Sequence, residues 1–318
     1  MNDTPNPFQL PENRLASTEA SGKRHYIYPA RVKGPIHNFR WVLHLGFILF
    51  FLILPWIKIN NQQVLLLDIV HRRFSIFGLT FWAHEAPILF LVFAGFILGI
   101  GLLTALYGRV WCGWACPQTV FVETLFRRIE NWIEGAGISQ RRFNKRALSI
   151  NKVLRKGFKW IIFLVVSLMI THSFLAYFIG SDRLLQIIQR PPSQNFTAFT
   201  VILFSTAIIL FDFGWFREQF CIIACPYGRL QSVMMNEDSK LILYDSNRGE
   251  PRNKNPSSNP GSGDCIDCFR CVAVCPTGID IRRGVQMECI MCTACVDACN
   301  TVMKKTNKPK GLISYQSE

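Results

Sequence analysis

The chain has 318 residues, half of them hydrophobic, with 26 Phe, 12 Cys and a formal net charge of +14 at pH 7. So apolar a composition is unusual for a soluble domain, and this length allows more than one domain. All 12 cysteines occur in short, regular motifs, which excludes a disulfide-rich secreted scaffold and indicates thiols kept in a reducing compartment.

The first 37 residues are polar and rich in Pro and Asn, so they predict an N-terminal tail without a cleavable signal peptide. A helix needs roughly 20 apolar residues to cross a bilayer core of about 30 Å. Four later segments are apolar over a length close to this. They are residues 41–57, 87–107, 160–180 and 196–216, each bounded by charged or polar residues. We therefore expect a helical membrane domain over residues 38–235.

The distribution of basic residues predicts the orientation of the spans. Residues 1–40 hold six Lys or Arg and residues 109–159 hold eleven, whereas residues 58–86 hold three and residues 180–195 hold two. Because basic loops stay on the cytoplasmic side, we expect both termini inside and the two lightly charged loops outside. The net charge then reflects topology and attraction to anionic lipid, so no nucleic-acid partner is expected.

An amphipathic helix is predicted after the second span. Pro117 suits the first helical position, because its missing N–H would have no partner there. One face carries Phe121, Leu125, Ile129, Trp132 and Ile133, and the other carries Glu123, Arg127, Arg128, Glu130 and Glu134. Two placements stay open: flat on the cytoplasmic membrane surface, or docked on the C-terminal domain.

A repeat links two distant parts of the membrane domain. Trp111-Cys-Gly-Trp-Ala-Cys-Pro and Phe220-Cys-Ile-Ile-Ala-Cys-Pro align without a gap, and each follows an even-numbered span. Helical residues four apart share a face, and a thiol at a helix N-terminus is easier to deprotonate. We predict one four-sulfur active site formed by Cys112, Cys116, Cys221 and Cys225. Copper(I), an extra iron–sulfur cluster or a reversible disulfide would suit it, and simple packing is the alternative.

Ionisable residues inside the spans are costly and are usually functional. His44, His172 and Asp212 lie in spans, and Asp212 precedes Cys221 by nine residues, where it could tune the thiols or carry a proton. His71 and His84 are expected on the outer side. We keep His172 and His84 as candidate metal ligands. For each of them, a structural role is expected at least as much as metal binding.

Eight cysteines near the C-terminus form two Cys-x2-Cys-x2-Cys-x3-Cys runs, the binding pattern of two 4Fe–4S clusters. In such proteins the fourth cysteine of each run binds the other cluster. The predicted ligand sets are therefore Cys265, Cys268, Cys271 and Cys299 for one cluster, and Cys289, Cys292, Cys295 and Cys275 for the other. Zinc is the alternative, but zinc does not need runs of three cysteines.

The predicted fold is mostly α: a polytopic helical membrane protein with four spans and a cytoplasmic two-cluster ferredoxin-like domain. A cytoplasmic tail over residues 1–37 precedes the membrane domain of residues 38–235. A linker over residues 236–263 leads to the ferredoxin domain of residues 264–303, and a second tail covers residues 304–318.

The motifs together resemble the FixG/CcoG/RdxA family of cytochrome oxidase accessory proteins. The resemblance rests on Tyr28-Pro29, Trp111-Cys-Gly-Trp-Ala-Cys-Pro-Gln, Cys221-Ile-Ile-Ala-Cys-Pro-Tyr-Gly-Arg and the run that begins at Asp264. It implies a multi-pass protein of the bacterial inner membrane that reduces Cu(II) to Cu(I) for maturation of a cbb-type oxidase. Members usually continue into one more span and an immunoglobulin-like domain, so we expect this chain, which stops at Glu318, to be a shortened form.

The leading functional hypothesis is therefore a cupric reductase that receives electrons from a cytoplasmic donor. Its expected partners are copper, membrane lipid, assembly proteins of the cbb-type oxidase and a second copy of the chain. Two alternatives are a quinol-linked relay to a periplasmic reductase and a non-catalytic copper-binding assembly factor. No flavin or nicotinamide motif occurs in the sequence, so the donor is expected to be a separate molecule.

Overall fold

The computed structural model of the chain describes residues 24–59, 62–68, 73–76, 79–81, 86–254 and 261–317. Most of the predicted N-terminal tail and two of the candidate histidines, His71 and His84, lie outside these residues. The described part is mostly helical, as expected from the sequence.

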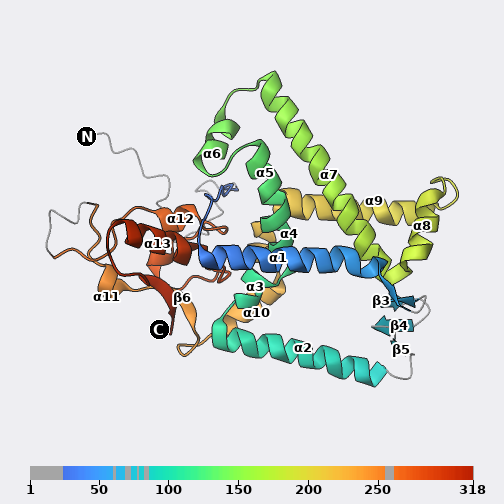
Figure 1. Cartoon of the computed structure of the whole chain (residues 1–318), viewed down its shortest axis with the longest axis horizontal. Helices are drawn as coiled ribbons and strands as arrows, with labels where there is room; N and C mark the ends of the chain where they lie inside the picture. Colours follow the sequence, from blue (N-terminus) through green and yellow to red (C-terminus); the bar gives the residue numbers. More distant parts are fainter. Residues whose placement is uncertain are drawn as a thin grey trace.

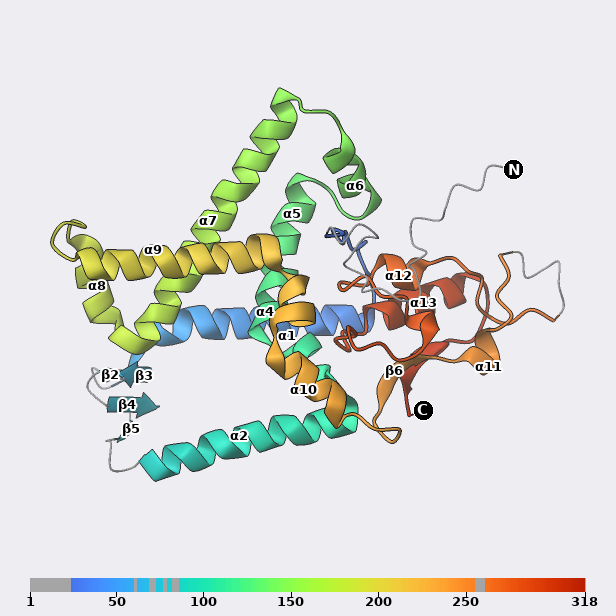
Figure 2. The same ribbon diagram turned by 180° about the vertical axis from the view of Figure 1, so that it is seen from behind.

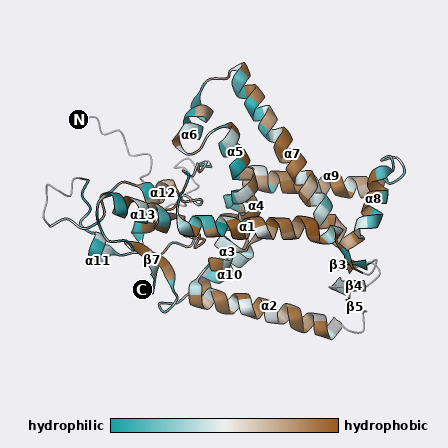
Figure 3. Cartoon of the chain, viewed as in Figure 1, coloured by the Kyte–Doolittle hydropathy of each residue, from teal (hydrophilic) through white to brown (hydrophobic). Residues whose placement is uncertain are grey.

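Four long helices are apolar enough to cross a membrane, which confirms the number of predicted spans. They are α1 (Pro35–Ile53), α2 (Ala86–Tyr107), α7 (Ile150–Ile179) and α9 (Phe196–Phe211). Only 6% of the apolar window of α2 and 11% of that of α9 is buried inside the protein. Most residues of these two helices are hydrophobic (Figure 3), and many of their large apolar side chains are exposed, as a lipid environment requires.

Helix α7 contacts both α1 and α9, while α2 lies apart from these three and contacts α10 (Pro226–Met234) (Figures 1 and 2). Aromatic rings fill the centre of the bundle. Phe163 of α7 is fully buried, and its ring centroid lies 4.9 Å from that of Phe126. Phe213 packs on Phe126 from a third segment, so the two halves of the membrane domain share one core.

Short strands and one helix gather at the end of α1 that is remote from the cysteine-rich domain (Figure 1). The antiparallel pair β1–β2 and the antiparallel sheet β3–β4–β5 follow α1 along the chain. Their bounds are Lys58–Ile59, Gln62–Gln63, Leu65–Asp68, Arg73–Ile76 and Leu79–Phe81, and α8 (Ser181–Gln189) lies near them. The two lightly charged loops of the sequence thus occupy one end of the bundle, and the cysteine-rich domain lies at the other.

The segment after α2 folds as a chain of short helices and not as one surface helix. It comprises α3 (Val110–Trp114), α4 (Pro117–Phe121), the π-turn Val122–Phe126, α5 (Arg127–Ile133) and α6 (Ile138–Lys145). The prediction of a helix lying flat on the membrane does not fit, because most of the charged face is buried and only Arg128 of that face is exposed. Glu130 is 7% exposed and Glu134 is 4% exposed.

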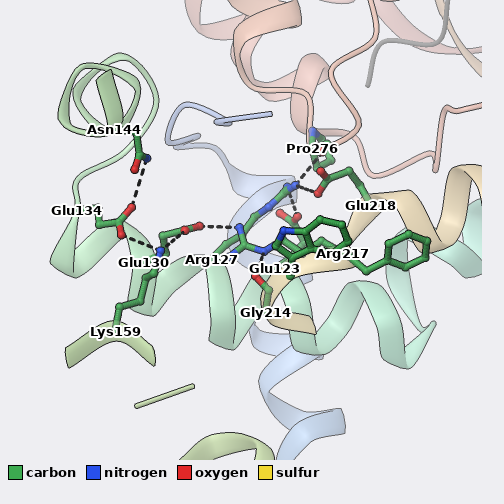
Figure 4. Close-up of polar contacts among 12 residues, drawn as sticks. Glu123, Arg127, Glu130, Glu134, Asn144, Lys159, Gly214, Arg217, Glu218 and Pro276 are labelled. Atoms are coloured by element: carbon green, nitrogen blue, oxygen red, sulfur yellow. Dashed lines mark hydrogen bonds and ion pairs between the residues drawn. The ribbon is translucent and has the colours of Figure 1, made fainter. Parts of the chain in front are cut away.

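Buried ion pairs hold α5 in place (Figure 4). Glu130 accepts from the Arg217 guanidinium at 2.6 Å and from the Lys159 ammonium at 3.1 Å, and Glu134 pairs with Lys159 at 2.7 Å. Burial would raise the pKa of the Glu130 carboxyl, but Arg217 and Lys159 outweigh burial and lower that pKa to about 2. The partners come from α7 and from the segment after α9, so this network joins three parts of the membrane domain.

Arg127 extends the network to the cysteine-rich domain. Its guanidinium donates to Glu218 at 3.0 Å and to the carbonyl oxygen of Pro276 at 2.9 Å, and it also pairs with Glu123. Pro276 follows directly after Cys275 of the first cysteine run. Of the two placements expected for this helix, the structure therefore agrees with docking on the C-terminal domain.

The C-terminal domain contains α11 (Ser246–Gly249), α12 (Arg270–Ala273), a 3₁₀ turn (Ile281–Arg283) and α13 (Ala294–Lys305). It also contains an antiparallel strand pair formed by β6 (Leu241–Tyr244) and β7 (Ile313–Gln316), with Leu241 opposite Gln316. These strands fall in the segments predicted as a linker and as a tail. They differ from that prediction because their apolar residues, Ile242 and Ile313 among them, pack in the same core as Cys271 and Cys289.

Candidate functional site: two cysteine groups joined by one loop

Each membrane repeat places its second cysteine at a helix start. Cys116 caps α4 and Cys225 caps α10, with Pro117 and Pro226 at the first helical positions, as predicted. The amide of Cys116 donates to the carbonyl of Trp111 at 2.9 Å, and the amide of Cys225 donates to that of Phe220 at 2.8 Å. Both bonds reach back five residues, so each pair sits on a π-type turn and not on one regular α-helical face.

The four membrane thiols form one group. Charge on Cys112, Cys116 or Cys225 raises the pKa of the Cys221 thiol, and charge on Cys116 or Cys225 raises that of Cys112. Burial is the larger cause in both cases and raises the pKa of Cys112 to about 11. The nearby Arg109 guanidinium opposes this rise. The four cysteines that the repeat predicted are therefore near enough to interact by charge, although among the described residues no three of them converge on one point.

The expectation that the helix N-termini ease deprotonation is wrong for Cys116. The amides of Gln118 and Thr119 do act in that direction, but burial outweighs them and raises the pKa of the thiol. Burial therefore favours the neutral thiol form of Cys112, Cys116 and Cys221 near pH 7, because it raises the pKa of each.

A buried polar cluster supports Cys112, and sequence reasoning missed it. The Cys112 thiol donates to the side-chain oxygen of Gln231 at 3.0 Å. The Gln231 amide nitrogen donates to Thr104 at 3.0 Å and to the Tyr227 hydroxyl at 2.9 Å. Gln231 is 0% exposed, so its polar atoms must be satisfied inside the protein. The sequence signal that could have revealed this cluster is the polar residue Gln231, which lies six residues after Cys225 in the helix that Cys225 begins.

The eight C-terminal cysteines line two cavities. One is bordered by Cys265, Cys268, Cys271 and Cys299. The other is bordered by Cys275, Cys289, Cys292 and Cys295, together with Cys271. Each cavity is therefore lined by three cysteines of one run and by the fourth cysteine of the other run, and the second cavity also reaches Cys271.

Burial dominates the electrostatics of these thiols. It raises the pKa of Cys275 to about 11 and that of Cys289 and Cys299 to about 12. Within the described residues, no group of three His, Cys, Asp or Glu side chains is close enough together to hold a single metal ion. A 4Fe–4S cube takes its thiolates on different iron atoms, so thiols spread around a cavity fit that group better than thiols converging on one point.

One loop of the cysteine-rich domain is fixed to the membrane domain from three directions. The Trp114 indole donates to the carbonyl of Met291 at 3.1 Å, and the Arg40 guanidinium donates to that of Cys292 at 3.0 Å. The Arg109 guanidinium also donates to the carbonyl of Met287. These donors belong to α1 and to the segment that carries Cys112, so the loop of the second cysteine run rests on the membrane thiol site.

A glycine permits this close approach. A Cβ on Gly113 would lie 2.2 Å from the carbonyl oxygen of Ile290 and 3.1 Å from the Cα of Cys292. Cys112, Ile290 and Cys292 accordingly share one buried cluster. Only a residue without a side chain allows the backbone of α3 to touch the backbone beside a cluster cysteine.

The ionisable residues predicted inside the spans are placed differently. His44 is buried and its Nδ1 lies 3.1 Å from the Thr124 hydroxyl, while His172 Nδ1 lies 2.7 Å from the carbonyl of Leu168 in its own helix. Asp212 accepts from the side-chain amide of Gln118 at 3.1 Å, and Gln118 follows Cys116 by two residues in the sequence. The other candidate ligand, His84, is outside the described residues.

Two family models for iron–sulfur domains match the chain, one over the C-terminal cysteines and one over the first membrane repeat. A model described as a 4Fe–4S dicluster domain matches residues 216–318. A second model, described as a 4Fe–4S binding domain, matches residues 87–146, which include Cys112 and Cys116. The chain therefore carries two 4Fe–4S clusters. No solved structure matches it significantly.

Three curated proteins are similar over most of the chain. Protein RdxA of Cereibacter sphaeroides is 38% identical over 296 residues, which are 91% of this chain and 62% of RdxA. The nitrogen fixation protein FixG of Rhizobium meliloti is 37% identical over 307 residues, covering 92% of this chain and 57% of FixG. Protein RdxB of Cereibacter sphaeroides is 37% identical over 315 residues, covering 96% of this chain and 65% of RdxB.

The chain thus spans about three fifths of the length of these relatives, from 57% of FixG to 65% of RdxB. The chain belongs to the FixG/RdxA family, and it combines a 4Fe–4S dicluster domain with helices that are apolar enough to cross a membrane.

Proposed function

We propose that this chain is a cupric reductase of the bacterial inner membrane, which transfers one electron to each Cu(II) bound at Cys112, Cys116, Cys221 and Cys225. The supporting observation is the contact between Gly113 and the loop around Cys292. This contact holds the membrane thiols against one of the cysteine groups of the iron–sulfur domain. Reduced copper would then serve the assembly of a cbb-type oxidase.

The cluster ligands follow from the cavities. We assign Cys265, Cys268, Cys271 and Cys299 to one cluster, and Cys275, Cys289, Cys292 and Cys295 to the other. When bound, the clusters supply one-electron carriers. The protein contributes the fixed loop, because Arg40, Trp114 and Arg109 hold the cluster side of the interface by hydrogen bonds to backbone oxygens.

The membrane thiols suit copper for two reasons. Soft sulfur ligands favour Cu(I) over Cu(II), so binding to sulfur makes the gain of one electron more favourable. Gln231 holds the Cys112 thiol at 3.0 Å in a buried position, which limits its access to water. The step is balanced by one electron from the donor for each copper ion, while the thiol protons leave when the metal binds.

We place the iron–sulfur domain in the cytoplasm, because residues 1–40 and 109–159 carry most of the basic residues that flank the spans. The donor is then a cytoplasmic one-electron reductant. The strands β1 to β5 and α8, which lie at the opposite end of α1, would face the periplasm.

A purified-protein assay tests the proposal. The protein is reduced, freed of excess reductant and mixed with Cu(II) or with a soluble quinone, and cluster oxidation is followed by visible absorbance. We expect Cu(II) to oxidise the clusters with formation of one Cu(I) per electron. Oxidation by the quinone alone would favour a quinol-linked relay, and no oxidation by either would favour a non-catalytic assembly factor.

The double variant Cys116→Ser/Cys225→Ser locates the site. Each change removes a thiol from the membrane group and leaves the eight C-terminal cysteines untouched, so we expect normal cluster absorbance and no copper reduction. The exposed Thr200 of α9 offers a control, and Thr200→Ser should keep full activity. Full copper reduction by the double variant would show that the membrane thiols are not the site of the reaction.

A further inference from the structure

A third cavity, of about 830 Å³, lies between the start of α1, α5 and the iron–sulfur domain. Its lining includes a concentration of buried polar atoms that have no hydrogen-bond partner among the described residues. They are His37 Nδ1, Trp41 Nε1, His44 Nε2, Arg127 Nε and Gln140 Nε2. The Trp, Arg and Gln nitrogens can only donate, and the two imidazole nitrogens are able to donate. Side chains that carry N–H donors therefore outnumber carboxylates in this lining, which favours a ligand with oxygen acceptors.

The charge of the lining points to an anion. Arg31, Lys33, Arg40 and Arg128 border the cavity, and no carboxylate of the described residues pairs with any of them. Arg31 and Arg40 donate to backbone carbonyls, and the Arg128 guanidinium lies over the Trp41 ring at 4.6 Å from its centroid.

Two carboxylates also line the cavity, but both are already neutralised. Glu123 pairs with Arg127, and Glu130 pairs with Arg217 and Lys159. The lining therefore keeps a net positive charge, which a neutral ligand would leave uncompensated.

An apolar stripe on α1 runs from the same cavity along the span. Val42 borders the cavity and is 61% exposed. Phe39, Leu49, Phe50 and Ile53 are also exposed at helical spacing on this side of α1. An anion without an apolar part would not use this stripe, so the two features together indicate an amphiphile.

We propose that the cavity binds the phosphate head group of an anionic phospholipid, whose acyl chains lie along the exposed stripe of α1. Basic pockets beside membrane helices bind such head groups. Trp41 lies at the boundary between the charged and apolar parts, a level at which tryptophan is enriched in membrane proteins. A quinone would use the stripe and the donors but would not balance the cations.

The bound lipid would join three parts of the protein. The cavity is bordered by α1, by α5 and by Val274, Pro276 and Ala294, which neighbour cluster cysteines. The head group would therefore hold the iron–sulfur domain against the membrane surface. This inference does not depend on copper reduction and would stand if that proposal failed.

The test compares lipid binding by the purified full-length chain and by a variant that lacks three cations at the cavity mouth, Arg31→Gln/Lys33→Gln/Arg128→Gln. Dioleoyl phosphatidylglycerol and dioleoyl phosphatidylcholine are titrated separately, and native mass spectrometry counts retained lipid. We expect one phosphatidylglycerol per chain, weak retention of phosphatidylcholine, and a loss of affinity of about fivefold for each cation removed.

A matched control removes the same charge elsewhere. Lys304, Lys305 and Lys310 are exposed on the iron–sulfur domain, and Lys304→Gln/Lys305→Gln/Lys310→Gln should retain phosphatidylglycerol as the unmodified chain does. Visible absorbance of the clusters verifies folding, and the single variant Arg128→Gln serves if the triple variant does not fold.

Three results would overturn the proposal: equal retention of phosphatidylcholine, undiminished phosphatidylglycerol binding by the cavity variant, or an equal loss in the control. A fourth arm adds inorganic phosphate alone. Displacement of the lipid by equimolar phosphate would show that the site takes a soluble anion instead. Quenching of tryptophan fluorescence by chain-brominated phosphatidylglycerol, lost in Trp41→Phe, would place the lipid at the cavity.

Discussion

Gly113 touches the backbone of Ile290 so closely that a methyl group on its Cα would stand 2.2 Å from the Ile290 carbonyl oxygen. The contact joins the segment of the membrane cysteines to a loop between two cysteines of the iron–sulfur domain. The distance between the two redox groups therefore depends on the absence of one side chain.

Gly113→Ala should slow copper reduction several-fold while both 4Fe–4S clusters stay bound. The added methyl group must push the loop away from α3, and overpacking of this kind costs about 1–3 kcal/mol. Stopped-flow oxidation of the reduced protein by Cu(II) measures the rate. Gly99→Ala is the control, because a Cβ at Gly99 of α2 meets nothing within 4 Å. A Gly113→Ala protein as fast as the control would show that this contact does not matter for electron transfer.

The crossed ligand sets make a spectroscopic prediction. Cys299→Ser should remove the same electron paramagnetic resonance signal as Cys265→Ser, because the two residues line one cavity. Cys275→Ser should remove the signal that Cys292→Ser removes. Iron content should fall from about eight to about four atoms per chain in each variant, since each cube holds four. A shared signal for Cys265→Ser and Cys275→Ser instead would mean that each run binds its own cluster.

Arg40→Gln should lower the reduction potential of the cluster beside Cys292. The guanidinium donates to the Cys292 carbonyl at 3.0 Å, and a nearby positive charge favours the reduced, more negative cluster. We expect a shift on the order of tens of millivolts, because charge and hydrogen bonds around the cluster determine its potential. Potentiometric titration checks both clusters, and Arg40→Lys should recover part of the shift. An unchanged potential in Arg40→Gln would leave this arginine a purely structural role.

Glu130→Gln should destabilise the membrane domain strongly. The change leaves Arg217 and Lys159 with one neutral partner, and removing one member of a buried ion pair costs about 3–5 kcal/mol. The control is Asp182→Asn, whose carboxylate pairs with Lys58 but is 69% exposed, so its loss should cost only about 0–1 kcal/mol. Thermal unfolding in detergent measures both. Equal melting temperatures for the two variants would contradict the buried character of the network.

The same carboxylate predicts a pH dependence. Its pKa is about 2 in the folded protein and near 4.5 when unperturbed, because Arg217 and Lys159 outweigh burial. A carboxyl group with a lowered folded pKa stabilises the fold fully above its ordinary pKa, and this contribution is lost as the pH falls toward 2. The stability difference between the unmodified chain and Glu130→Gln should therefore be constant from pH 7 to 5.5 and shrink below pH 4.5. A difference that grows on acidification would contradict this assignment.

Several features were predictable because they depend on neighbours in the sequence. Long apolar runs specify the spans. Pro117 and Pro226 begin helices because the backbone N–H that proline lacks would have no hydrogen-bond partner at the first helical position. The iron–sulfur clusters follow from cysteine spacing alone. In each case the physical cause lies within a few residues of the motif.

Other features depend on residues far apart in the sequence. The charged face of α5 reads as a solvent-exposed face because its partners, Arg217 and Lys159, lie elsewhere in the chain. The strand pair formed by residues 241–244 and 313–316 was missed because each strand is only four residues long and gains its stability from the other. The support of Cys112 by Gln231 joins residues 119 positions apart, and no local pattern encodes it.

The hydrogen bond from Arg40 to Cys292 joins the first membrane helix to a loop that is synthesised 252 residues later. Chains emerge from the ribosome N-terminus first, so this helix must enter the lipid long before its partner exists. Assembly is therefore ordered: the first helix is made before the loop, and the two can be joined by this hydrogen bond only after the second cysteine run has been synthesised.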